Sequence, residues 1–162
     1  MAWKSKTPLT DDEEVLVTAT MDCGFTVHRT LGPGFKESIY TEALSLELNL
    51  RGMKFEREKA IKVKYREWRI PGQRVDLIVE NLIIVEVKTI PAVRALHRRQ
   101  VLSYLRTTGL PIGLIMNFNT EKLIEGFRRV VLTPAFSPSG GDPRTGHGTG
   151  NDHNGHDERD EC

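Results

Sequence analysis

The sequence predicts a mixed α/β domain, in which a central sheet is flanked by helices. Three observations predict this class. Two N-terminal segments carry apolar residues at helical spacing, a run of strand-like segments follows them, and a third helical segment precedes two last strands. With 162 residues, of which 38% are hydrophobic and 28% charged, the chain is long enough for one domain with a hydrophobic core.

The first two elements are expected to be helices. Residues 10–13 (Thr-Asp-Asp-Glu) form a capping-box pattern with acids in the first turn, which predicts a helix start. This helix should end at Leu31, because the Gly-Pro-Gly stretch at 32–34 cannot continue it. A second helix is expected to begin near Phe35 and to stop at Gly52.

Strands make up most of the remaining pattern. Four strand-like runs follow the second helix, over residues 54–57, 61–65, 73–79 and 82–89. The last two runs are the most apolar, which indicates central strands. Pro91 is expected to open a third helix that reaches Thr107, and two strands should follow over 112–117 and 127–132.

Residues 134–162 are rich in Gly, Pro, Asp and His, and contain almost nothing that can be buried. Such a segment cannot offset the entropy of ordering, so we expect a domain over 1–133 and a disordered tail over 134–162. The tail contains His147, His153 and His156, which could be read as a metal-binding tract. A Gly-rich segment holds no fixed geometry, so incidental surface histidines are the favoured interpretation.

Charge and cysteine content indicate the compartment and the kind of partner. The net charge of +1 conceals an acidic tail: 134–162 carries six acids and two bases, and the remainder carries 21 bases and 16 acids. A basic globular part suits a polyanion such as nucleic acid, although many proteins without such a partner are equally basic. No apolar run is long enough for a membrane span, no signal peptide is visible, and only Cys23 and Cys162 are present, so a cytoplasmic location is expected.

Ionisable residues stand at the centres of the two most apolar runs. Burying a charge costs several kcal/mol unless it is paired or bound to a metal, so ionisable residues in central strands indicate a charge partner or a bound metal. Glu86 and Lys88 are two positions apart and project to one face of their strand. A three-residue loop at 80–82 would set Asp76 opposite Glu86 on that face, whereas a two-residue loop would turn Asp76 away. Asn81 suits the left-handed backbone of odd-length loops, and this favours the first arrangement.

Two carboxylates and a lysine on one sheet face are typical of a metal-dependent hydrolytic site. Carboxylate oxygens bind Mg²⁺ or Mn²⁺, and the metal can activate a water and neutralise charge on phosphoryl oxygens. A lysine can position or deprotonate the attacking water. The alternative is a structural Lys–Glu ion pair beside an exposed aspartate, and the spacing alone leaves both interpretations open.

Longer motifs carry a resemblance to known families. Asp76, followed after ten residues by Glu86-Val87-Lys88, resembles the PD-(D/E)XK nuclease signature, with Val75 in place of the proline. Residues 100–104 match the QxxxY element that follows this signature in related nucleases. Upstream, Gly34, Glu37 and Tyr40 fill the three positions that define the GxxExxY protein family, so that the resemblance covers roughly residues 15–133.

The resemblance implies a restriction-endonuclease-like fold and a role for each motif residue. It implies Glu37, Asp76 and Glu86 as metal ligands and Lys88 as the residue that handles the water. It also implies substrate contacts from Gln100, Tyr104, Tyr40, Arg98 and Arg99. Each role has a plainer alternative: Glu37 can complement a helix dipole, Tyr40 and Gln100 can be packing residues, and the arginines can form a solvated face.

Two further residues are read from their context. His28 is expected to be a buried, hydrogen-bonded histidine, and Trp68, in an expected turn, is read as a packing residue that could instead stack on a base. The function predicted from all of this is a Mg²⁺- or Mn²⁺-dependent nuclease acting on DNA first, with RNA as an option. The alternative is a catalytically silent nucleic-acid-binding or interaction module on the same fold, and a homodimer is an option by analogy.

Overall fold

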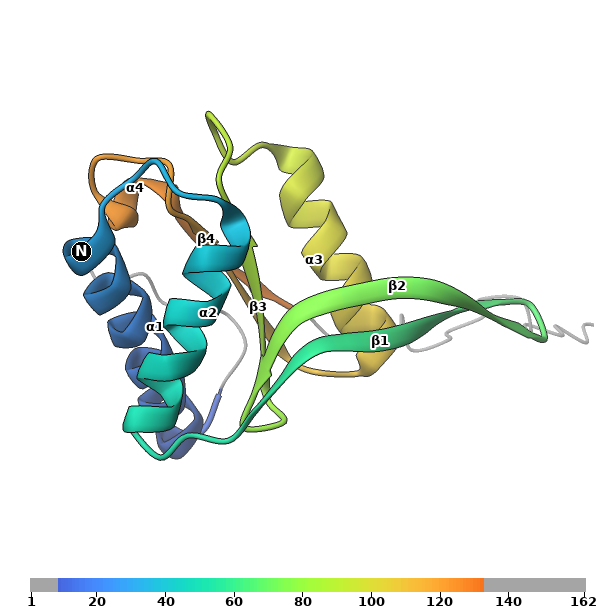
Figure 1. The fold of residues 1–162 in the computed structure, drawn as a ribbon. Helices are drawn as coiled ribbons and strands as arrows, with labels where there is room; N and C mark the ends of the chain where they lie inside the picture. Colours follow the sequence, from blue (N-terminus) through green and yellow to red (C-terminus); the bar gives the residue numbers. More distant parts are fainter. Residues whose placement is uncertain (1–8, 133–162) are drawn as a thin grey trace, which may run out of the picture.

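The computed structural model describes residues 9–132, and the predicted tail with its histidines lies outside them. A five-stranded mixed sheet has helices on both faces, as predicted (Figure 1). The elements, in chain order, are α1 (Asp11–Leu31), α2 (Glu37–Leu50), β1 (Phe55–Tyr65), β2 (Trp68–Val79), β3 (Ile83–Lys88), α3 (Ala95–Thr108), β4 (Ile112–Asn117), α4 (Leu123–Gly126) and β5 (Phe127–Val131). None of the helices in 9–132 is long and apolar enough to cross a membrane.

The strands follow the sheet in chain order, β1-β2-β3-β4-β5. Three of the four neighbouring pairs are antiparallel, and β3 pairs with β4 in parallel. In this parallel pair, Glu86 lies opposite Ile115. A parallel pair needs a crossover connection, and α3 supplies it. The crossover therefore places α3 over the sheet directly beside β3, the strand with the predicted ExK residues.

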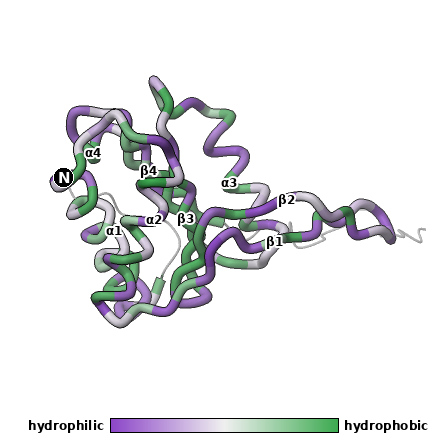
Figure 2. The backbone as a smooth tube through the Cα atoms, in the orientation of Figure 1, coloured by the Kyte–Doolittle hydropathy of each residue, from purple (hydrophilic) through white to green (hydrophobic). Residues whose placement is uncertain are grey.

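Two apolar cores lie on opposite faces of the sheet. Helices α1 and α2 cover the face that carries Leu77 and Val85, whereas α3 covers the face that carries Ile78 and Ile84. This alternation has the period of two that a strand imposes. Figure 2 shows hydrophobic residues concentrated where the helices meet the sheet. Even-numbered positions of β3 accordingly face α3.

The helix signals in the sequence are confirmed for α1 and need correction for α3. Thr10 caps α1 through the predicted capping box with Glu13, and α1 ends at Leu31. Helix α3 begins at Ala95, not near Pro91. The Asn117 side chain binds both backbone groups of Ile90, at 3.0 and 2.8 Å, and so fixes the bend at Ile90 and Pro91 before the helix.

The strands before Val79 are longer than predicted. The two expected runs at 54–57 and 61–65 form one strand, β1, and β2 begins at Trp68 instead of Gln73. Glu58 (φ 44°) and Gly72 (φ 115°) have irregular backbone conformations. These irregularities let β1 and β2 stay paired through segments where the sequence pattern predicted that a strand would end. The result is a long β1–β2 hairpin whose outer half projects beyond the helices (Figure 1).

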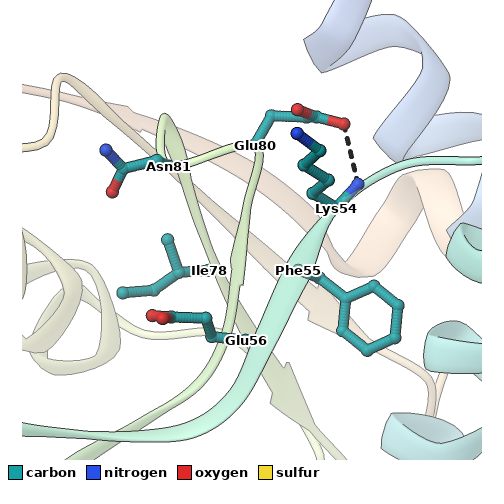
Figure 3. Close-up of a pocket in the computed structure, with 6 residues that line it drawn as sticks. All are labelled: Lys54, Phe55, Glu56, Ile78, Glu80 and Asn81. Carbon is teal, nitrogen blue, oxygen red and sulfur yellow. Dashed lines mark hydrogen bonds between the residues drawn. The ribbon is translucent and has the colours of Figure 1, made fainter.

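The β2–β3 connection decides which residues face each other. Val79 pairs with Ile83, so the loop has the three residues predicted, and Asn81 adopts the expected left-handed backbone (φ 52°). Glu80 is also left-handed and accepts a hydrogen bond of 2.7 Å from the backbone N–H of Lys54 (Figure 3). Continued by one residue beyond Leu77, this register sets Asp76 opposite Glu86.

Candidate active site

The three ionisable residues of the strand pattern lie close together on β2 and β3. The Lys88 ammonium donates a hydrogen bond of 2.7 Å to Oε1 of Glu86. Oδ2 of Asp76 accepts one of 2.8 Å from the backbone N–H of Val87, where the β2–β3 ladder ends. The Asp76 carboxylate thus accepts the Val87 N–H in place of a backbone carbonyl of β2. This hydrogen bond holds the Asp76 side chain beside Glu86.

Burial raises the pKa of both strand carboxyl groups, and the charge of Asp76 adds to the change at Glu86. Burial, followed by the charge of Asp76, raises the pKa of Glu86 to about 7, although the hydrogen bond from Lys88 opposes the change. Burial also raises the pKa of Asp76, and the Val87 hydrogen bond opposes it. Groups with strongly raised pKa values beside a specific charge partner are typical of functional sites.

Glu37 reaches the same site from the other side of the domain. It is the first residue of α2 and is partly buried. Burial raises its pKa first, the charge of Asp76 raises it further, and Lys88 lowers it. The helix-borne acid therefore lies within electrostatic reach of the strand-borne residues, as the predicted role requires.

Helix α3 brings Tyr104 to the carboxylates. Its ring is 5% exposed, and its hydroxyl accepts a hydrogen bond of 2.9 Å from Gln73 Nε2. Burial and then the charge of Glu86 raise the pKa of Tyr104 to about 12. Gln100 stands one helical turn earlier on the same face. Gln73 was missed by the sequence analysis, although a polar residue at the start of an apolar run is a visible signal.

Tyr40 has a packing role, and its predicted contact with substrate is corrected. It is 0% exposed, and its ring stacks on Phe118 with the centroids 4.5 Å apart. Its hydroxyl donates to Gly32 O (2.6 Å) and accepts from Phe35 N (3.1 Å). No part of this side chain is left for a substrate, but it braces the loop that leads into Glu37.

A family model described as the PD-(D/E)XK nuclease superfamily matches residues 14–130. The chain belongs to this superfamily. The match spans the whole sheet and both helices that bring side chains to the carboxylates, α2 and α3. No curated protein and no solved structure was found to match the chain.

The oxygen atoms in this PD-(D/E)XK site suit a divalent metal. Oε2 of Glu86 is buried and accepts no hydrogen bond from any residue in 9–132, and such an orphaned anionic oxygen is costly without a partner. Carboxylate oxygens are the ligands that Mg²⁺ and Mn²⁺ prefer. A cation beside Asp76 and Glu86 would satisfy this atom and offset the repulsion by which Asp76 raises the pKa of Glu86.

The three predicted ligands do not form a closed metal cage. Among the residues described, no three His, Cys, Asp or Glu side chains converge closely enough to enclose an ion. Lys88 holds one oxygen of Glu86 through a hydrogen bond. The site is therefore open, and the role of Glu37, Asp76 and Glu86 as metal ligands stays a prediction.

The remaining predicted residues differ in their exposure. Arg98 and Arg99 are exposed on α3. His28 is buried and bonded to Thr120 O at 2.8 Å, as expected. Trp68 is 62% exposed and pairs with Tyr65 across the hairpin, so the packing interpretation of Trp68 is corrected.

The hollow drawn in Figure 3 does not include the carboxylates of Asp76 and Glu86. Its volume is about 380 Å³, and it lies where β2 ends, between β1 and the β2–β3 loop. Its lining is Lys54, Phe55, Glu56, Ile78, Glu80 and Asn81. We place the site at Asp76, Glu86 and Lys88 because buried charge and an orphaned oxygen mark chemistry more specifically than open volume does.

Proposed function

We propose that this chain is a Mg²⁺- or Mn²⁺-dependent nuclease that hydrolyses phosphodiester bonds of nucleic acid, with DNA as the first substrate to test. The observation that carries the proposal is the buried pair of Glu86 and Lys88, with Asp76 opposite and one Glu86 oxygen without a hydrogen-bond donor. A domain that only needed a stable core would gain from apolar residues at these positions. Membership of the superfamily supports the same reaction class.

Asp76 and Glu86 would hold the metal, and Glu37 would complete its shell from α2. When bound, a divalent metal supplies an activated water and neutralises charge that develops on the phosphoryl oxygens. The chain's own groups do the rest. Lys88 presents its ammonium where it can orient the attacking water or stabilise the pentavalent phosphorus, and the hydrogen bond to Glu86 fixes its position.

Tyr104 and Gln100 would line the substrate channel. Tyr104 stays protonated, because its pKa is about 12, and it can donate a hydrogen bond to a phosphate oxygen while its hydroxyl oxygen is held by Gln73. Tyr104 and Gln100 lie on α3, close to β3, which carries Glu86. From there they can reach a nucleic-acid substrate bound over the carboxylates. Arg98 and Arg99 are candidates for contacts with more distant phosphates.

We further propose that the chain is of the GxxExxY type within the superfamily, with its domain over residues 1–133. Three structural features support this. Gly34 has φ of 117°, a backbone that favours glycine; Glu37 is electrostatically coupled to Asp76; and the Tyr40 hydroxyl ties together the loop before Glu37. Each motif residue thus contributes to placing the helix-borne carboxylate.

Cleavage by the purified full chain tests the proposal. Single- and double-stranded DNA and RNA are incubated with Mg²⁺, with Mn²⁺ or with EDTA, using the wild type, Asp76→Asn and Lys88→Met. The expected result is metal-dependent cleavage that both substitutions abolish, while Glu121→Gln, an exposed acid far along the chain, leaves it intact. Cleavage that ignores EDTA or survives both substitutions would overturn the proposal.

The second candidate is a nucleic-acid-binding module without turnover. The hydrogen bond that already joins Lys88 to Glu86, together with the open arrangement of the carboxylates, is the observation that favours it. It predicts salt-dependent binding that Mg²⁺ does not convert into cleavage. The same set of incubations, with binding measured alongside, decides between the two.

A further inference from the structure

The β1–β2 hairpin divides into two halves with different charge chemistry. In the half next to the domain, bases are matched by acids: Arg57 pairs with Glu42, Lys59 with Glu56 and Arg74 with Glu58. The projecting half, residues 62–72, which we call the arm, carries four bases and only one acid, Glu67. Figure 2 shows hydrophilic residues along much of the arm.

The bases of the arm converge on α3. Together with the last turns of that helix they line a hollow of about 380 Å³, here called the basic hollow, formed by Lys62, Val63, Lys64, Arg69, Arg106 and Thr107. Four of its six residues are basic and none is acidic. Within residues 9–132, none of these four bases takes part in an ion pair.

This arrangement opposes the stability of the hairpin. Lys64 and Arg69 are direct cross-strand partners, and like charges in that position are destabilising. Arg106 adds a further positive charge from the helix. Basic side chains without acidic partners repel one another across the hollow, and a bound anion would remove this repulsion. The basic hollow is therefore suited to bind an anion.

A chain of residue contacts joins the basic hollow to the proposed active site. Ile61, next to Lys62, pairs with Gln73, and Gln73 binds the hydroxyl of Tyr104, whose ring lies beside Glu86. Along α3, the six steps from Gln100 to Arg106 span roughly 9 Å at a rise of about 1.5 Å per residue. At about 3.4 Å per nucleotide of one strand, this is on the order of three nucleotides.

We propose that the arm and the end of α3 grip the sugar–phosphate backbone of a nucleic-acid strand, a few nucleotides away from the bond at the carboxylates. Lys62, Lys64, Arg69 and Arg106 bind its phosphates. The inference rests on the proposed function for its choice of ligand, and it assigns the hairpin arm as the part of the chain that holds the substrate outside the catalytic centre.

Binding without cleavage tests the inference. Fluorescence anisotropy of labelled single-stranded DNA, duplex DNA and RNA oligonucleotides is measured in EDTA over a series of salt concentrations, with the full chain. The test variant is Lys64→Gln/Arg69→Gln. Its control is Lys54→Gln/Lys122→Gln, which removes the same charge from exposed positions outside the basic hollow. A second variant, Lys64→Arg/Arg69→Lys, keeps the charge and exchanges the side chains.

The test variant is expected to weaken binding by about tenfold or more and to reduce the slope of log affinity against log salt by about one to two. The control and the charge-keeping variant should stay within about twofold of the wild type. A wild type that binds no oligonucleotide, or equal losses in the test variant and its control, would overturn the inference. Binding that depends on the arm, with no cleavage under any metal, would instead sustain the inference and refute the nuclease proposal. Which oligonucleotide shows the largest effect identifies the strand that the arm holds.

Discussion

Lys88 and Glu86 stand two residues apart on β3, and the Lys88 ammonium donates a hydrogen bond of 2.7 Å to one oxygen of Glu86. The other oxygen is buried and accepts no hydrogen bond from residues 9–132. The lysine therefore fixes the orientation of the carboxylate, while the second oxygen remains available to a ligand from the side of Asp76. The predictions that concern the site assume that one Glu86 oxygen binds the Lys88 ammonium and that the other binds a metal cation.

The raised pKa of Glu86 makes folding stability depend on pH. Its carboxyl has a pKa of about 7 in the folded chain, against 4.5 when unfolded, so the folded state binds more protons between these values. The stabilisation is complete below pH 4.5 and is lost as pH rises through 7. The unfolding free energy in EDTA should therefore fall between pH 5 and pH 8 by on the order of 2–3 kcal/mol.

Glu86→Gln should remove most of that fall, because a neutral amide does not titrate. Urea unfolding at a series of pH values measures it, and Glu121→Gln, an exposed acid, should keep the wild-type slope. A Glu86→Gln variant that loses stability with pH as steeply as the wild type would show that Glu86 is not the group responsible.

The ion pair between Glu14 and Arg129 joins α1 to β5. Two hydrogen bonds of 2.9 and 2.7 Å connect them, and the bonds from Arg129 lower the pKa of Glu14. Because Glu14 is largely exposed and screened by solvent, the pair should contribute only about 0.5 kcal/mol at pH 7. For a lowered pKa, this contribution is present above 4.5 and is lost as pH falls through the folded value.

A double-mutant cycle with Glu14→Gln and Arg129→Gln measures the coupling directly. The coupling free energy should be positive at pH 7 and should disappear as pH falls through the lowered pKa of Glu14 in the folded chain. A coupling that is unchanged in acid would mean that packing, rather than charge, joins the two residues.

Tyr40→Phe should destabilise the fold without removing a substrate contact. It deletes the hydroxyl that donates to Gly32 O and accepts from Phe35 N, and the loss of two hydrogen bonds costs about 1–3 kcal/mol. Tyr65→Phe, at an exposed position, should change the unfolding free energy by less than about 0.5 kcal/mol. If Tyr40→Phe left stability intact and selectively abolished oligonucleotide binding, a direct contact with substrate would return as the better explanation.

Gly113→Ala should push α3 away from the sheet. A Cβ at this position would lie 2.3 Å from Cγ1 of Val101, a β-branched and fully buried residue on α3. Such overpacking costs about 1–3 kcal/mol. The clash should be relieved in Gly113→Ala/Val101→Ala, so that the two substitutions together cost less than the sum of each alone. Simple additivity would show that the helix and the strand do not meet there.

Local signals in the sequence predicted the parts of the fold that depend on local chemistry. The capping box before α1, the bounds of β4 and the three-residue loop at Asn81 are all confirmed. Parity of that loop was enough to place Asp76 beside Glu86, because a strand has a period of two. The sequence could therefore predict which strand residues face each other at the candidate site.

Features that depend on tertiary contacts could not be predicted from the sequence. The start of α3 is set by Asn117, which binds Ile90 from a strand 27 positions away. The continuous β1 depends on irregular backbone at Glu58, which no residue preference signals. The hydroxyl of Tyr40 could have faced a substrate until the loop at Gly32 was seen to fill its hydrogen bonds. In each case a distant partner decides between two locally acceptable outcomes.

The central claim is that Asp76 and Glu86 share a divalent cation. Titration of the full chain with Mn²⁺, followed by the electron paramagnetic resonance signal of the free ion, measures this without requiring catalysis. Asp76→Asn and Glu86→Gln should each weaken Mn²⁺ binding by about tenfold or more, whereas Glu121→Gln should bind as the wild type does. Equal binding by all four proteins would contradict the claim.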